Sequence, residues 1–148
     1  MIDLLLAAAL LQPASCYAAG AGGGLPGCPD WRSVTRDREG EVYIDPATLE
    51  RSGDMITVIT RIVYARGDEN GTRSHVTRAR FDCARRTSAI LHLATYDARG
   101  RRLDDWEVSG EPAEPRPVEP NSPGQTIINA LCPRPAPAAR KEISCSTF

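Results

Sequence analysis

The chain has 148 residues, a formal net charge of -1, a sequence pI near 6.1 and 5% aromatic residues. This length leaves room for one domain and its ends, and the balanced charge provides no overall attraction to nucleic acid, which we exclude as a partner. Twelve glycines and twelve prolines indicate many turns.

Residues 1–19 are typical of a secretory leader. The eight residues after Asp3 are all Leu or Ala, a run that is too short to cross a bilayer but suits the apolar part of a signal peptide. Small residues follow it, so cleavage after Ala18 or Gly20 is expected. Because no Lys or Arg precedes the run, the alternatives are a misplaced start codon and a buried N-terminal helix.

The cysteines occupy positions 16, 28, 83, 132 and 145, and no two have C-x-x-C spacing, so neither a zinc finger nor a thioredoxin-type site is supported. Cys16 either leaves with the leader or is a lipidation site. The second alternative arises because the residues before Cys16 are similar to a lipobox, although a proline replaces the usual Leu, Val or Ile. Four cysteines then remain, and three pairings are open. We favour Cys83–Cys132, which closes a loop of about 50 residues worth about 4 kcal/mol, with Cys28–Cys145 as a second pair. The alternative is that all stay reduced and buried.

Residues 20–30 have the Gly- and Pro-rich composition of a tether. Beyond them, alternating apolar residues and turn signals predict six strands with short connections, and hence one antiparallel meander sheet. The predicted strands span residues 31–37, 41–45, 55–66, 73–83, 88–96 and 103–108. The third of these carries apolar side chains on both faces, which is typical of a central strand.

Two helical segments are predicted. An Asp-Pro pair at 45–46 supplies an N-cap and a first helical residue, so a short helical turn is expected over 45–49. A longer helix is expected within 122–132, where Ile127 and Leu131 would face the sheet.

The remaining segments lack regular structure by composition. Five prolines within residues 110–124 exclude a central strand, so this stretch is expected to run extended across the surface. Residues 133–148 have the composition of a disordered tail. The folded domain is therefore expected to cover residues 31–132.

Six features of this domain follow one another in a characteristic order. They are Trp31, a Tyr-x-Asp-Pro segment at 43–46, a Gly-Asp break at 53–54, a strand ending in Asp82-Cys83, a strand ending in Tyr96, and a closing Leu131-Cys132. This order resembles the surface-adhesin E family. The resemblance implies an α+β domain of the bacterial envelope, with one antiparallel sheet, a packed helix and a disulfide between Cys83 and Cys132. It implies adhesion for some members, and it implies no catalytic residues.

No catalytic, cofactor-binding or metal-binding constellation is identified in the sequence. Residues 22–27 match G-x-G-x-x-G, but a leader precedes them and Pro26 interrupts them, so we interpret them as part of the tether. If Arg85-Arg86 forms a hairpin turn, His75 and His92 lie on one face of the sheet, about 13 Å apart along the strands. This separation is too large for one metal ion, so we expect histidines that hydrogen-bond to their neighbours.

Arginines gather in two clusters, which the meander places at opposite ends of a hairpin. The first comprises Arg78, Arg80, Arg85 and Arg86, and the second comprises Arg99, Arg101 and Arg102. Turn arginines usually serve only solubility, and the alternative is bidentate contact with an anionic partner such as a sulfated glycan or lipopolysaccharide. Arg99, Arg101 and Arg102 are the candidate contact residues.

Together, these patterns favour an exported, non-enzymatic binding or adhesin-like domain that needs no cofactor and lies in the periplasm or at the cell surface. The expected partner is a protein or an anionic glycan at the cell envelope. The alternative is a periplasmic structural or accessory protein that forms a homodimer or binds an envelope partner through its sheet.

Overall fold

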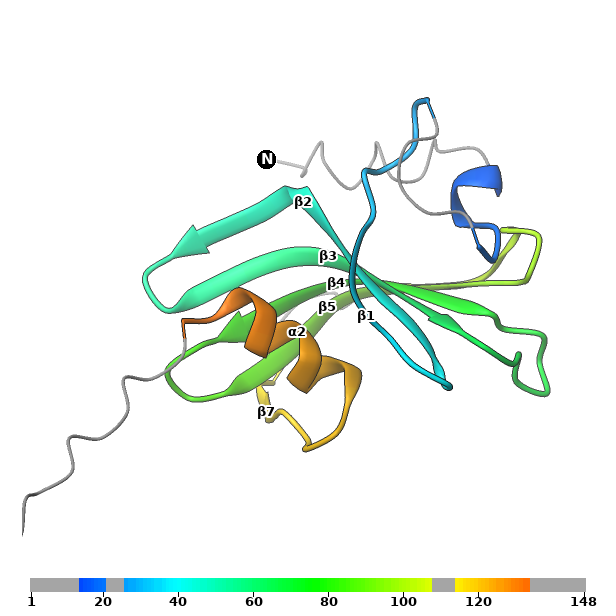
Figure 1. The fold of residues 1–148 in the computed structure, drawn as a ribbon. Helices are drawn as coiled ribbons and strands as arrows, with labels where there is room; N and C mark the ends of the chain where they lie inside the picture. Colours follow the sequence, from blue (N-terminus) through cyan, green and yellow to red (C-terminus); the bar gives the residue numbers. More distant parts are fainter. Residues whose placement is uncertain (1–13, 21–25, 108–113, 134–148) are drawn as a thin grey trace, which may run out of the picture.

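A computed structural model of the protein describes residues 14–20, 26–107 and 114–133 (Figure 1). Its main element is one antiparallel sheet whose first six strands lie side by side in chain order, which confirms the predicted meander. A short helix, α2 (Pro123–Leu131), packs on one face of this sheet. The strands are β1 (Arg32–Arg36), β2 (Gly40–Ser52), β3 (Met55–Tyr64), β4 (Ser74–Asp82), β5 (Thr87–Tyr96) and β6 (Arg102–Glu107). The α+β class expected from the sequence is therefore confirmed.

A seventh, two-residue strand lies in the proline-rich crossing. This strand, β7 (Arg116–Pro117), pairs with the first residues of β5. β6 pairs with the other end of β5, so the two strands share one edge of it. Both residues of β7 are exposed, in keeping with the expected extended course over the surface. Proline, which has no backbone N–H, is tolerated here because a strand at the edge of a sheet has no partner on its outer side.

The strand β3 has buried side chains on both faces, as predicted for a central strand. Ile56 and Val58 are fully buried and pack against the α2 side of the core. Ile59 and Val63 point to the opposite face, where they contact a second cluster. Because successive side chains alternate across a sheet, this one strand supplies both halves of the core.

The core consists of two clusters separated by the sheet. The cluster on the α2 side comprises Val42, Ile56, Val58, Ala79, Phe81, Ile127, Ile128 and Cys132. The cluster on the other side comprises Cys16, Tyr17, Trp31, Tyr43, Val76, Ala94 and Tyr96. The second cluster depends on a segment from the start of the chain, which includes the 3-10 turn η1 (Ala14–Tyr17).

The start of α2 is stabilised by Ser122 and Pro123. Ser122 is the N-cap, and its Oγ accepts a hydrogen bond from the backbone N–H of Gln125 at 3.2 Å. Pro123 occupies the first helical position, where no N–H is needed. Ile127 is buried against the sheet, as expected, and Ile128 is fully buried beside it.

The short helical turn expected over residues 45–49 is replaced by an irregularity within β2. Asp45 pairs with Ile59 and Glu50 pairs with Thr57. The four residues 46–49 therefore bulge out of β2 opposite a single residue of β3. Asp45 still binds the backbone N–H of Ala47, at 3.1 Å, as a capping residue would. The Thr48 hydroxyl accepts a hydrogen bond from Ile59 N at 2.9 Å, which ties the bulge to β3. Strand pairing thus overrides the local helix signal.

The pairing of β4 with β5 differs from the expected register. Asp82 pairs with Thr87, and a bulge at Leu91 then shifts the remaining pairs by one residue. His75 therefore lies on the α2 side of the sheet, whereas His92, opposite Arg78, lies on the other side. The prediction that both histidines share one face is wrong, because an inserted residue reverses the side on which later residues project.

The structure contains two disulfides among the described residues. Cys83 is bonded to Cys132, the pair favoured by the sequence. Cys28 is bonded to Cys16 and not to Cys145, which corrects the second predicted pair. This correction arises because the segment around Cys16 packs in the core, which brings the two cysteines within a Cα–Cα distance of 5.3 Å.

Several predictions lie outside the described residues. These are the apolar run of the leader, most of the G-x-G-x-x-G segment, residue Cys145 and the tail over 134–148. In the described part of the chain, no helix is long and apolar enough to cross a bilayer.

Candidate functional site

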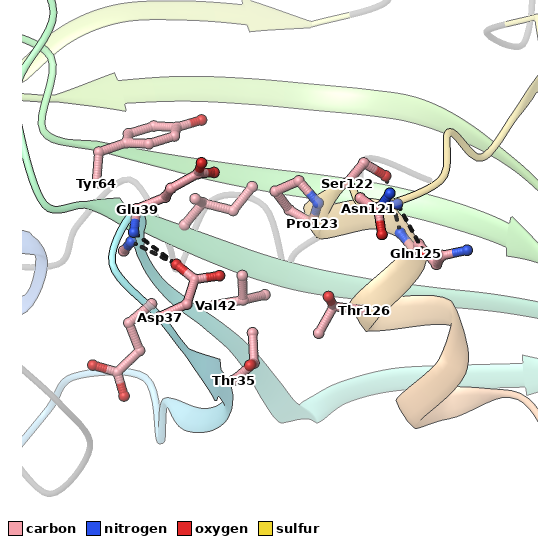
Figure 2. Close-up of a pocket in the computed structure, with 13 residues that line it drawn as sticks. Thr35, Asp37, Glu39, Val42, Tyr64, Asn121, Ser122, Pro123, Gln125 and Thr126 are labelled. Atoms are coloured by element: carbon pink, nitrogen blue, oxygen red, sulfur yellow. Dashed lines mark hydrogen bonds between the residues drawn. The ribbon is translucent and has the colours of Figure 1, made fainter.

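A pocket of about 340 Å³ lies between the β1–β2 hairpin and the start of α2 (Figure 2). Its apolar lining includes Val42 and Ile62, and Tyr64 forms one wall. The remaining lining residues are mostly polar and come from the hairpin and from the helix N-terminus: Thr35, Asp37, Glu39, Gly40, Glu41, Asn121, Ser122, Pro123, Gln125 and Thr126.

Two polar side chains of this pocket, those of Asp37 and Gln125, hold backbone N–H groups. The Asp37 carboxylate accepts hydrogen bonds from the N–H groups of Glu39 and Gly40, at 2.8 and 3.1 Å. The Gln125 side-chain oxygen accepts a hydrogen bond from the Asn121 backbone N–H at 2.9 Å. Gln125 thus satisfies a backbone donor just before the helix, as in a capping box. Among the described residues, no histidine, cysteine or lysine lines the pocket.

The two histidines bind different partners. His75 Nδ1 lies 3.2 Å from the Tyr64 hydroxyl, and the two rings meet edge to face at 5.1 Å. His92 Nε2 lies 2.5 Å from Asp105 Oδ1, on the other face of the sheet. Among the described residues, no group of three potential ligands is close enough to hold a metal ion. The histidines thus bond to neighbouring side chains, as the sequence suggested.

Burial of His75 makes the stability of the fold depend on pH. Burial lowers the pKa of His75, with Asp68 opposing the shift, so the unfolded chain binds a proton at a pH where the folded protein does not. The stabilisation is complete above the ordinary histidine pKa of about 6.5 and is lost as the pH falls below it. We expect the free energy of unfolding, measured with urea, to fall between about pH 7.5 and about pH 5, and His75→Gln to reduce this fall. An equal fall in His75→Gln would contradict the assignment, and His92→Gln serves as the control on the opposite face.

The edge strand β6 is the most exposed element of the six-strand meander. All six of its residues are exposed, including Leu103 at 45% and Trp106 at 53%. It pairs with β5 on one side and ends the strand order on the other. Such an edge presents unpaired backbone donors and acceptors to any approaching strand. Tryptophan is enriched at protein interfaces relative to the rest of the surface.

The arginines predicted to contact an anionic partner lie in the turn before β6 and at its first residue. Arg101 pairs with Asp97 and Arg102 pairs with Asp105, each at 2.7 Å. In the described part of the chain, the Arg99 side chain has no acidic partner, and all three arginines are exposed. The three arginines lie at the opposite end of β5 from the Arg85-Arg86 turn.

Two features of the structure were not identified from the sequence. Trp106 was placed in a strand without a role, because exposure at an edge depends on the order of the strands. Arg61, at the middle of β3, is fully buried, although an arginine is expected at the surface by default.

Comparison with known proteins identifies a family and no individual relative. The family described as surface-adhesin protein E matches residues 31–133. No curated protein and no solved structure matches the chain. The matched region begins at Trp31 and contains all six strands of the meander and α2.

Proposed function

Because the chain belongs to the surface-adhesin protein E family, we propose that it is an exported, envelope-associated domain that binds a partner and catalyses no reaction. Two disulfides support export, since such bonds persist in oxidising compartments. The Asp37 and Gln125 side chains of the pocket accept hydrogen bonds from the backbone, which supports a structural role for these two polar groups.

The exposed edge strand β6 is the observation that carries this proposal. A partner strand can hydrogen-bond to the outer edge of β6, while Leu103 and Trp106 provide apolar contact. Trp106 can remove a large apolar area from water on binding, and tryptophan is enriched among residues that dominate interface energies. We therefore favour a protein partner over a glycan.

The neighbouring arginines would guide an acidic partner to this edge. Arg99 is available for a new ion pair, whereas Arg101 and Arg102 would have to exchange the carboxylates of Asp97 and Asp105 for those of the partner. Exposed ion pairs contribute little to stability, about 0–1 kcal/mol, so this exchange is easy. Charges at the rim of an interface mainly raise the association rate and make binding sensitive to salt.

Binding can be tested with the purified protein against immobilised matrix proteins and heparin. We expect Trp106→Ala to weaken binding to a protein at least about tenfold, and the combined change of Arg99, Arg101 and Arg102 to alanine to slow association. The matched control is Arg85→Ala with Arg86→Ala, which removes the same type of charge at the other end of β5. Binding to heparin alone, abolished by salt, would indicate a glycan partner. Unchanged binding by all variants would contradict the role of β6.

The same edge also supports the alternative of self-association. Two copies of β6 could pair with each other and bury Leu103 and Trp106 from both chains. A homodimer in light scattering, lost in Trp106→Ala, together with no external binding, would favour the structural or accessory role over adhesion.

A further inference from the structure

A fully buried arginine lies at the centre of the second core cluster. Arg61 is 0% exposed and points away from α2. Its guanidinium donates hydrogen bonds to the backbone carbonyls of Tyr17 and Ala18, each at 2.8 Å, and of Cys16 at 3.5 Å. Burial lowers the pKa of Arg61. A buried charge is tolerated only where hydrogen bonds replace water, and these carbonyls supply them.

Aromatic rings complete the surroundings of this guanidinium. It lies 5.9 Å from the ring centre of Trp31 and 6.0 Å from that of Tyr43, within the range of cation–π contact. Tyr17 stacks on Tyr96 with ring centres 4.4 Å apart, and it is only 3% exposed. We call this site, formed by Arg61, Trp31, Tyr43 and Tyr96, the Arg61 recess.

The segment that fills the recess is attached at both ends. At its start, Cys16 is bonded to Cys28. After it, the Ala19 N–H donates a hydrogen bond to the carbonyl of Ala98, in the turn between β5 and β6, at 3.0 Å. Cys16 and Cys28 both lie outside the region matched by the family, so the family does not imply this arrangement.

Removal of this segment would leave the recess incomplete. Cleavage after Ala18 or Gly20 would delete all three carbonyls, withdraw the Tyr17 ring and leave Cys28 without its partner. The guanidinium would then border an open space lined by aromatic rings. Lipidation of Cys16 would break the same disulfide, because the lipid bonds to the sulfur, and would attach a large group to a residue that is 1% exposed.

We propose that the Arg61 recess is a binding site for backbone carbonyls, and that its occupant in the mature protein is the segment 16–18. Any leader is then cleaved at the bond between Ser15 and Cys16 or upstream of it, and Cys16 forms a disulfide in place of a lipid anchor. This proposal rests on the proposed export, because only an exported chain is processed in this way.

The test uses the full chain, expressed in a bacterial host with its own N-terminus and recovered from the envelope fraction. Mass spectrometry without reduction is expected to find a mature N-terminus at or before Cys16, and a peptide containing Cys16 linked to one containing Cys28. A first residue at or beyond Tyr17, or a lipid on Cys16, would overturn the proposal. Recovery from the cytosol alone would instead contradict export, and hence the proposed function.

A second measurement applies even if the chain is not exported. In the purified, oxidised full chain, Tyr17→Ala is expected to lower the midpoint of thermal unfolding by about 10 °C, because it empties part of a buried cluster. Ile90→Ala, which shortens an apolar side chain that is 43% exposed, should leave the midpoint nearly unchanged. Equal midpoints for Tyr17→Ala and wild type would show that the segment does not occupy the recess.

Discussion

Replacing Cys83 and Cys132 together by alanine is expected to lower the free energy of unfolding by about 4 kcal/mol. The disulfide joins residues 49 apart in sequence and connects the end of β4 to the end of α2. Without it, the unfolded chain gains the freedom of a long open loop, while α2 loses its covalent attachment to the sheet. For a domain of this size, the loss is a large share of the total stability.

Urea unfolding of the double variant and the wild type, both fully oxidised, measures this difference. The matched control replaces Cys16 and Cys28 by alanine, which opens a loop of only 12 residues and is expected to lower the free energy by roughly 3 kcal/mol. A loss below about 1 kcal/mol for the first pair would show that the packing of Ile128 and its neighbours holds α2 without the disulfide.

Gly40→Ala is expected to lower the free energy of unfolding by about 3 kcal/mol. Gly40 begins β2 opposite Tyr64, and a Cβ atom there would lie 2.1 Å from the carbonyl oxygen of Val63. That oxygen belongs to the backbone of β3, so the new atom can be accommodated only by moving the two strands apart. The Asp37 carboxylate, which holds the Gly40 N–H, resists this movement.

Gly53→Ala provides the matched control for this substitution. Gly53, in the β2–β3 turn, has a φ of +59°, but a Cβ atom there would meet nothing within 4 Å. The substitution is opposed only by the left-handed backbone conformation, which costs an alanine about 1 kcal/mol of stability. Urea unfolding of both variants separates the two effects. Similar losses at Gly40 and Gly53 would contradict the close contact between β2 and β3.

Much of the fold could be predicted because its signals are local. The alternation of apolar residues in β3 indicates directly that both faces are buried, and this placed β3 in the interior of the sheet. The helix over residues 122–132 was expected from neighbouring residues, and its Ser122-Pro123 start also depends only on adjacent residues. Tight turns between consecutive strands then led to a meander without further assumptions.

The errors arose where a distant contact outweighs a local signal. Asp45 and Pro46 carry the residues of a helix start, yet pairing with β3 keeps them in β2. The β4–β5 turn was expected to centre on Arg85-Arg86, but Asp82 accepts hydrogen bonds from Ala84 N and Arg85 N and closes the turn earlier. A bulge such as that at Leu91 has no signature in a single sequence.

The candidate site was partly predictable for the same reason. The cluster of Arg99, Arg101 and Arg102 is evident from its spacing, whereas the exposure of Trp106 depends on β6 being the last strand in the sheet order. The burial of Arg61 depends on a segment more than forty residues upstream, which pattern alone assigned to a leader.

Protease treatment of intact cells that express the full chain tests whether the domain acts as an adhesin. Because the proposed binding surface on β6 must meet its partner outside the cell, trypsin should release peptides from residues 31–132 without lysis, while a cytoplasmic marker stays intact. Release of these peptides only after the outer envelope is opened would place the domain in the periplasm and contradict the role in adhesion.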